Sequence, residues 1–186
     1  MTIIGVNVLL NTYRLIRDNS PETDIHFVYG PWTHGGWHDA SYQGLGSLEF
    51  GDGLSTYFME KIEYPFFRYY LENKGKRPEP VYVYASGSES WQMMETWPPK
   101  EMKYRALYLS SGNRLSFDAP DSTDSYSTYL SDPDDPVPFM ADASKRNKAY
   151  MVADQSFAYD REDVISFTGD VVDEVVKLQG PVKVEL

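Results

Sequence analysis

The sequence contains no cysteine, and that absence alone excludes several kinds of protein chemistry. Disulfide bonds, thiolate metal sites and a cysteine nucleophile all need the sulfur that the chain lacks. The cellular compartment stays open, because an exported protein need not carry disulfides.

Basic residues and long apolar runs are also scarce. Seventeen Lys and Arg stand against 28 Asp and Glu, which gives a formal net charge of −11. Such a charge repels phosphate backbones and anionic lipid surfaces, so neither nucleic acid nor a membrane is an expected partner. The run Val6–Leu10 is interrupted by Asn7, which makes it too short and too polar for a membrane span or a signal peptide.

A serine nucleophile in its usual surroundings is missing too. No Gly-x-Ser-x-Gly segment occurs, and the nearest approaches, Ser86–Ser88 and Gly44–Ser47, fit turns better than a strand-to-helix elbow. The segment Gly51–Gly53 lacks the lysine and the length of a phosphate-binding loop. We interpret it as a turn in which Asp52 or Ser55 caps the following helix.

What the chain does present is a histidine just after a predicted strand. The apolar run Ile25–Tyr29 ends at Gly30-Pro31, and His34 follows in a glycine-flanked loop. Open α/β sheets place catalytic side chains in such loops, past the carboxyl ends of their strands. By spacing alone, a loop histidine that packs beside Trp32 and Trp37 is the simpler interpretation, so the pattern by itself does not establish a general base.

Hydrophobic periodicity predicts two helices and several strands. Residues 6–17 and 54–73 each have an apolar helical face, and Pro65 should kink or break the second helix near Glu63. Charge, Gly and Pro at residues 74–80 indicate a linker. Beyond it, turn residues separate short β-type runs at 81–84, 105–109, 149–152, 164–167 and 182–186. The expected fold is therefore α+β, with helix–strand–helix followed by an antiparallel β-sandwich that has too few strands for a complete jelly roll.

Two groups of side chains raise the question of a metal. His34 and His38 have i, i+4 spacing, but Gly35 and Gly36 oppose the helix that a zinc pair of this kind needs, and His26 lies in a predicted strand. An acidic loop region lacks EF-hand spacing and fits a solvated surface better than a calcium site; its members are Asp118, Asp121, Asp124, Asp132, Asp134 and Asp135. We expect neither a metal nor a cofactor.

The order and spacing of ten short motifs resemble a known enzyme family. The family is the CocE/NonD-type serine hydrolases, which include α-amino-acid ester hydrolases, cocaine esterase, cephalosporin acylases and X-Pro dipeptidyl-peptidases. The motifs are Asn11–Tyr13, Gly30–Trp37, Glu63–Leu71, Gly87–Trp91, Trp97–Lys100, Asp132-Pro133, Pro136–Pro138, Asp154-Gln155, Arg161–Val164 and Gly180–Val182.

This resemblance implies a division of the chain and a role for one residue. Residues 1–76 would form the C-terminal part of an α/β-hydrolase domain, and residues 77–186 would begin a jelly-roll β-sandwich like the C-terminal domain of X-Pro dipeptidyl-peptidases. His34 would be the triad histidine, with the nucleophile and the oxyanion-hole tyrosine upstream of Met1. The triad aspartate would fall near Thr2, where this sequence has no acidic residue. The family's acidic cluster for a substrate amino group, expected next to that position, is absent as well.

The implied activity is cleavage of ester or amide bonds in α-amino acyl or related substrates through a Ser-Asp-His triad. Only the histidine is present here, so we expect a truncated product that is nearly inactive alone, with a small-molecule ester or amide as the partner of the intact enzyme. A full-length parent could be periplasmic or secreted. The truncated chain would expose a helix face and a strand edge that the parent covers, and we expect such surfaces to cause self-association.

Two alternatives stay open from the sequence. With 15 Tyr and 4 Trp, the chain could be a β-sandwich module that binds carbohydrate or another ligand. It could equally be an inactive remnant of an interrupted gene. For Trp91 and Trp97, packing in a core and service as a ligand platform are both compatible with the pattern.

Overall fold

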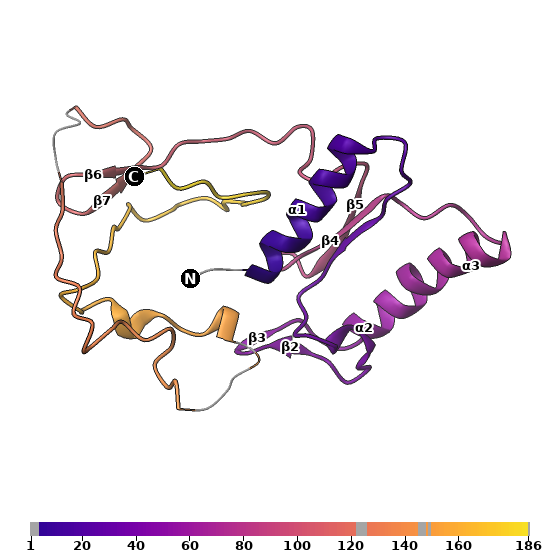
Figure 1. The fold of residues 1–186 in the computed structure, drawn as a ribbon, viewed down its shortest axis with the longest axis horizontal. Helices are drawn as coiled ribbons and strands as arrows, with labels where there is room; N and C mark the ends of the chain where they lie inside the picture. Colours follow the sequence, from indigo (N-terminus) through magenta and orange to yellow (C-terminus); the bar gives the residue numbers. More distant parts are fainter. Residues whose placement is uncertain (1–3, 122–125, 145–147, 149, 186) are drawn as a thin grey trace. The chain divides into compact units, whose positions relative to one another are not determined.

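The computed structural model describes residues 4–121, 126–144, 148 and 150–185, and its side-chain description begins at residue 8. These residues form two compact units: the first contains the elements from α1 to β5, and the second contains β6, β7 and η4 (Figure 1). The described residues have a mixed α+β fold with small sheets. None of their helices is long and apolar enough to cross a bilayer.

The first unit is built on a three-stranded sheet with one helix packed against it. The helix α1 (Ile4–Asn19) confirms the first predicted helix, and it ends just before Ser20-Pro21. In the sheet, β4 (Val81–Ala85) lies between β1 (Phe27–Tyr29) and β5 (Ser90–Met94). The strand β1 is parallel to β4, with Phe27 opposite Val81, whereas β5 is antiparallel to β4. The strands predicted at 25–29 and 81–84 are thus confirmed.

The core of this unit lies between α1 and the sheet. Its buried members are Tyr13, Phe27, Val81 and Val83, and the Tyr13 and Phe27 ring centroids are 4.8 Å apart. Leu10 packs against this cluster, but Leu9, which the periodicity also places on the apolar face, is 44% exposed. The described residues therefore cover only part of the apolar face of α1.

A long helical segment connects the parallel strands β1 and β4. It runs without interruption through α2 (Leu54–Tyr57), the π-helical segment η2 (Phe58–Glu63) and α3 (Tyr64–Glu72). Pro65 has no N–H to donate to the preceding turn, and the wider π turn before it accommodates that loss. The predicted disturbance near Glu63 is therefore a change of helix type rather than a break. Asn73, with φ of 55°, ends α3 in the left-handed conformation.

Tight turns occupy the two segments that resembled serine elbows. The strands β2 (Gly44–Leu45) and β3 (Leu48–Glu49) form a hairpin whose turn contains Gly46 at φ 63°. Residues 86–89 form the turn between β4 and β5. Neither segment joins a strand to a helix, so the interpretation of both as turns is confirmed.

The second unit contains far less β-structure than the sequence predicts. It has one hairpin, β6 (Tyr108–Ser110) with β7 (Arg114–Ser116), and the short helix η4 (Ser156–Ala158). The strand predicted at 105–109 begins only at Tyr108. Residues 164–167 form no strand, although the next residue, Thr168, makes a single bridge to Arg114.

The predictions of strands at 149–152 and 182–186 are also wrong. The run at 149–152 contains the 3₁₀ helix η3 (Tyr150–Val152), and residues 182–185 are irregular; residues 149 and 186 lie outside the described residues. Alternating apolar residues form a strand only where a neighbouring backbone supplies a ladder. A jelly roll is therefore not confirmed.

We expect Phe27→Ala to lower the free energy of unfolding by about 3–5 kcal/mol, because it opens a cavity in the core around a side chain that is 2% exposed. The matched control Phe67→Ala, at a ring that is 50% exposed, should cost less than half as much. All four tryptophans lie in the first unit, so urea unfolding followed by tryptophan fluorescence reports on this unit. Equal costs for the two substitutions would contradict this description of the core.

Candidate functional site

His34 lies in the loop that follows β1, as the sequence predicts. Its side chain is exposed, and its ring meets Trp37 edge to face with centroids 5.7 Å apart. Trp37 belongs to the short helix η1 (Gly36–His38). Among the described residues, no group forms a hydrogen bond with the His34 imidazole. A ring with free nitrogens can accept a proton from a hydroxyl and pass it on, which is the chemistry of a general base.

The hydroxyl of Tyr42 binds the part of the loop that precedes His34 in the sequence. It accepts a hydrogen bond from the Thr33 backbone N–H at 2.9 Å and donates one to the Pro31 carbonyl at 3.2 Å. Two neighbouring peptide groups are thereby fixed by one side chain. The Tyr42 ring also lies against Gly36, where an added Cβ would come within 2.7 Å of a ring carbon. Glycine is required at position 36 for this close approach.

The hydroxyl of Ser55 holds the loop from the start of α2. It accepts from the Trp32 indole N–H at 3.1 Å and donates to the Gly36 carbonyl at 2.8 Å. Ser55 is fully buried, so water cannot replace either partner. The predicted helix cap by Asp52 or Ser55 is wrong. Gly53 occupies the N-cap position without a side-chain cap, while Asp52 accepts a hydrogen bond from Gln43.

His26 is enclosed in a polar network at the start of β1. Its Nδ1 donates to the Glu79 carbonyl at 2.9 Å, and its Nε2 lies 2.8 Å from the Tyr70 hydroxyl. Tyr70 in turn donates to Asp24, which also accepts from Arg77 at 2.6 Å. With both ring nitrogens occupied and the side chain 8% exposed, His26 has no nitrogen left for catalysis.

Hydrogen bonds and burial in this network shift the pKa of two of its members. The pKa of Asp24 lies below its usual 3.8, first because Tyr70 donates to the carboxylate and then because Arg77 does the same. Burial, followed by the hydrogen bond to Asp24, raises the pKa of Tyr70. The network joins the end of α3 to the residues that enter β1, so its role is to hold these segments together.

The third histidine, His38, is also engaged. Its Nε2 lies 3.0 Å from a Glu63 carboxylate oxygen at the end of η2. The three histidines thus have separate surroundings, and no group of three or more potential metal ligands gathers in the part of the chain that the structure describes. Of the three, His34 is the one that combines exposure with an unoccupied imidazole.

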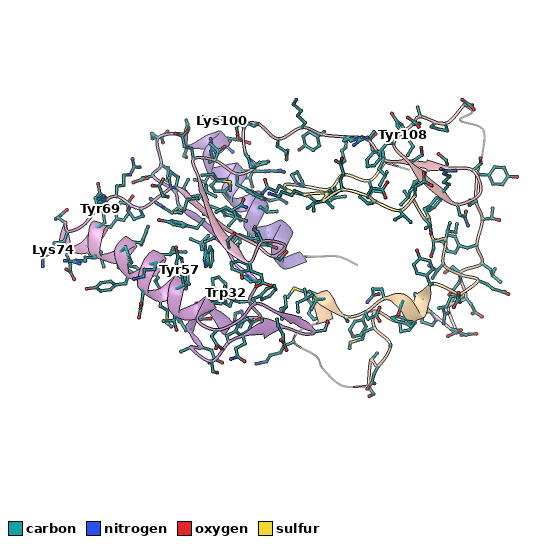
Figure 2. All side chains as sticks on the ribbon, turned by 180° about the vertical axis from the view of Figure 1, so that it is seen from behind. Trp32, Tyr57, Tyr69, Lys74, Lys100 and Tyr108 are labelled. Atoms are coloured by element: carbon teal, nitrogen blue, oxygen red, sulfur yellow. The ribbon has the colours of Figure 1, made fainter. Side chains whose placement is uncertain are left out.

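Aromatic side chains pack around Trp32 of this loop and around Trp91. The ring of Trp91 on β5 contacts Trp32 at 5.6 Å, Tyr84 at 5.5 Å and Tyr57 at 6.2 Å between centroids; Trp32 and Tyr57 are labelled in Figure 2. The indole Nε1 of Trp91 is buried and has no hydrogen-bond partner among the described residues. Trp97 instead packs against the core of the first unit. Both tryptophans therefore act in packing in this structure.

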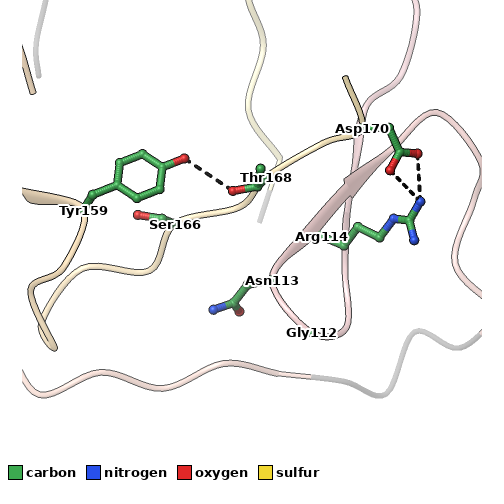
Figure 3. Close-up of a pocket in the computed structure, with 7 residues that line it drawn as sticks. All are labelled: Gly112, Asn113, Arg114, Tyr159, Ser166, Thr168 and Asp170. Carbon is green, nitrogen blue, oxygen red and sulfur yellow. Dashed lines mark hydrogen bonds and ion pairs between the residues drawn. The ribbon is translucent and has the colours of Figure 1, made fainter. Parts of the chain in front are cut away.

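The second unit contains a polar pocket of about 410 Å³ that involves none of the three histidines or their partners (Figure 3). Its polar groups bond to one another: Arg114 reaches both carboxylate oxygens of Asp170, at 3.0 and 2.8 Å, and the Tyr159 hydroxyl lies 3.3 Å from that of Thr168. The Ser166 hydroxyl also lines the pocket, but no base is hydrogen-bonded to it among the residues that the figure draws.

The acidic loop region also lies in this part of the sequence. Its described carboxylates are exposed, and Asp135 pairs with Arg161 at 3.2 Å; Asp124 lies outside the described residues. No metal-binding group is found there among the described residues. The exposure of these carboxylates fits the solvated surface that the sequence predicts.

Sequence reasoning identified His34 but missed the two hydroxyls that hold its loop. Tyr42 carries no local signal, and Ser55 has the position of an ordinary helix cap. The network around His26 was missed because its partners are distant in sequence: Tyr70 and Arg77 lie 46 and 53 residues from Asp24. The predicted position of a triad aspartate, near Thr2, lies outside the described residues.

Comparison with known proteins finds similar chains among curated proteins and among solved structures. The chain is 28% identical over 192 residues to the cocaine esterase of Rhodococcus sp. (strain MB1 Bresler), covering 95% of this chain and 32% of the esterase. No protein-family model matches. The chain spans about a third of the length of this relative.

Two of the solved structures that match are hydrolases by name. An α-amino acid ester hydrolase labelled with selenomethionine matches 92% of this chain and 30% of its own, with a TM-score of 0.80 and 28% identity. A crystal structure of an aminopeptidase from the marine sediment archaeon Thaumarchaeota archaeon matches 82% of this chain and 26% of its own, with a TM-score of 0.72 and 30% identity.

We expect Asp24→Asn to destabilise the first unit at neutral pH, and we expect that loss to disappear in acid. A carboxylate whose pKa is depressed in the folded state contributes stability above its unfolded-state pKa, and that contribution is lost as the pH falls through the folded-state value. The difference from the parent chain should therefore be constant from pH 7 to 5 and shrink below 3.8. Urea titrations at several pH values measure it. Asp18→Asn, on the exposed side of α1, is the control; an equal pH profile there would contradict the assignment.

Proposed function

We propose that this chain, which is similar to the CocE/NonD-type serine hydrolases, carries the general base, His34, of an enzyme that cleaves ester or amide bonds. One observation carries the proposal. His34 is exposed in the loop after β1, with both ring nitrogens unoccupied by described residues, while its loop is held by a partly buried hydrogen bond before His34 and a buried one after it. Catalytic bases need this combination of fixed backbone and accessible ring.

In the proposed reaction, a serine hydroxyl from outside these 186 residues attacks the carbonyl carbon of the substrate. His34 takes the serine proton as the new C–O bond forms, then gives it to the alcohol or amine that leaves as the old bond breaks. A water molecule next attacks the acyl-enzyme, again losing its proton to His34, and the proton returns to the serine as the acid departs. An aspartate, also from outside the described residues, would orient the ring through its second nitrogen.

We propose α-amino acyl or related compounds as the substrate class. The names of the related proteins support this, since an amino acid ester hydrolase and an aminopeptidase both act on an acyl group with an α-amino group, and cocaine esterase acts on an ester.

We also propose the division suggested by the sequence, with residues 1–76 ending a hydrolase domain and residues 77–186 beginning a jelly-roll sandwich. Its support is the change of composition at the linker and the hairpin of β6 and β7. The pairing of β1 with β4 crosses this linker, so the two proposed parts share a sheet at their junction.

The test is an ester hydrolysis assay, with p-nitrophenyl esters and aminoacyl esters, on the longest polypeptide encoded in frame with this chain. We expect His34→Ala to lower kcat by about 10⁴-fold, because removing a triad histidine removes proton transfer in both steps. The control is His38→Ala, an exposed histidine four residues away that should leave kcat within about twofold. Equal activity of the His34→Ala variant and the parent would show that His34 is not the base.

The 186-residue chain alone should hydrolyse these esters no faster than its own His34→Ala variant, since it has no serine elbow. Turnover by the chain alone that disappears in His34→Ala would contradict this expectation and place the nucleophile within it.

We expect the purified chain to self-associate, because its second unit exposes apolar side chains in a short stretch. Val171 and Val175 are each 89% exposed, and Leu178 is 84% exposed. Contiguous exposed apolar surface drives association in water. Sedimentation velocity should show a mass that rises with concentration, and the double substitution Val171→Lys and Val175→Lys should reduce that rise. A concentration-independent monomer would contradict the expectation.

A further inference from the structure

We propose that Tyr42 and Ser55 are positioning residues that determine where the His34 imidazole stands, an inference that rests on the proposed role of His34 as a base. Neither residue offers its hydroxyl to a substrate. Each hydroxyl accepts one hydrogen bond from the loop and donates another to it. Ser55 is therefore not a second nucleophile, although it is a serine close in space to the candidate base.

The attachments flank His34 closely. Before it, Pro31 and Thr33 are bound to Tyr42, and Trp32 is bound to Ser55; after it, Gly36 is bound to Ser55. The Gly36 N–H also donates to the Thr33 carbonyl at 2.9 Å, which closes the turn across His34 itself. His34 and Gly35 thus project from the loop, and the residues on either side of them, Thr33 and Gly36, are held by hydrogen bonds.

The conformation of Gly35 shows how the projection is formed. Its φ of 84° lies in the left-handed region, and nothing lies within 4 Å of the place where a Cβ would stand. The chain therefore reverses at Gly35 through backbone freedom and not through packing. Hydrogen bonds restrain this reversal instead: the Gly36 N–H bonds to the Thr33 carbonyl across it, and the two hydroxyls hold Thr33 and Gly36 on either side of it.

The two hydroxyls come from different elements. Ser55 belongs to α2, and Tyr42 lies between η1 and β2, so each can be removed without touching the other. Trp37, which contacts the His34 ring, follows Gly36 directly and moves with it. Loss of either hydroxyl should consequently alter the environment of the His34 ring while the sheet and the helices stay folded.

The effect expected in catalysis is on turnover and not on substrate binding. A base displaced by about 1 Å transfers protons more slowly, by up to about 100-fold, but the contacts that bind substrate are unchanged. In the active polypeptide, Tyr42→Phe and Ser55→Ala should lower kcat and leave KM within about twofold.

The primary experiment uses the ¹⁵N-labelled 186-residue chain and needs no activity. The chain has three histidines, so its imidazole cross peaks are few and can be assigned with His→Ala variants. Tyr42→Phe keeps the ring that packs on Gly36 and removes only the hydroxyl. We expect it to shift the His34 ring signals, which sense the Trp37 ring edge, and to speed amide exchange at Gly36 about tenfold. The His26 and His38 signals should stay in place.

The matched control is Tyr70→Phe, which removes a hydroxyl that binds Asp24 and faces His26. It should shift the His26 signals and leave those of His34 unchanged. Ser55→Ala should repeat the effect of Tyr42→Phe; if this buried substitution unfolds the chain, the decision rests on Tyr42→Phe. Unchanged His34 signals and Gly36 exchange in folded Tyr42→Phe would overturn the proposal, as would an equal response to Tyr70→Phe.

These outcomes are separable from the proposed function. The spectra report on His34 whether or not a serine is ever delivered to it, so a failed hydrolysis assay leaves the positioning result standing. Conversely, His34→Ala could abolish hydrolysis while Tyr42→Phe leaves the His34 ring signals unchanged. That result would support His34 as the base and contradict its positioning by these hydroxyls.

Discussion

The burial of Phe27 between Tyr13 and Val81 is the contact on which the first unit depends. It joins α1 to β1 and aligns β1 with β4, which follows it in the sequence only after the long helical segment. A parallel pair needs such a crossover connection, and it is stable only when its inner side chains are covered. The loop with His34 begins directly after this pair, so its starting point is set by apolar packing.

Hydroxyl groups then complete what apolar packing begins. Tyr42 and Ser55 satisfy polar backbone and indole groups of the loop, and Tyr70 connects α3 to the entry of β1. The crossover helices thus have two functions, because they connect the strands and also bind the segments before and after β1. A loop held in this way can leave one imidazole exposed without leaving its own backbone polar groups unsatisfied.

The sequence predicts the first unit better than the second, for a physical reason. Periodicity locates α1, whose apolar face meets the core, and the segment α2–α3, in which Leu54 and Ile62 are buried. Gly30-Pro31 locates the end of β1. Runs such as 164–167 and 182–186 have the same alternation but find no neighbouring strand among the described residues. The order of the motifs indicates the His34 loop. The role of Ser55 leaves no local sequence pattern, because this residue is buried and its partners are 19 and 23 residues away.

The strand order β1-β4-β5 has a consequence for how a larger sheet would grow. In the described residues β1 is hydrogen-bonded on one side only, so its other edge is open to a further strand. The carboxyl end of a strand added there in parallel orientation would lie at the same edge of the sheet as Tyr29, from which the His34 loop leaves. The open edge of β1 is therefore a place where a further strand could extend the sheet next to the His34 loop.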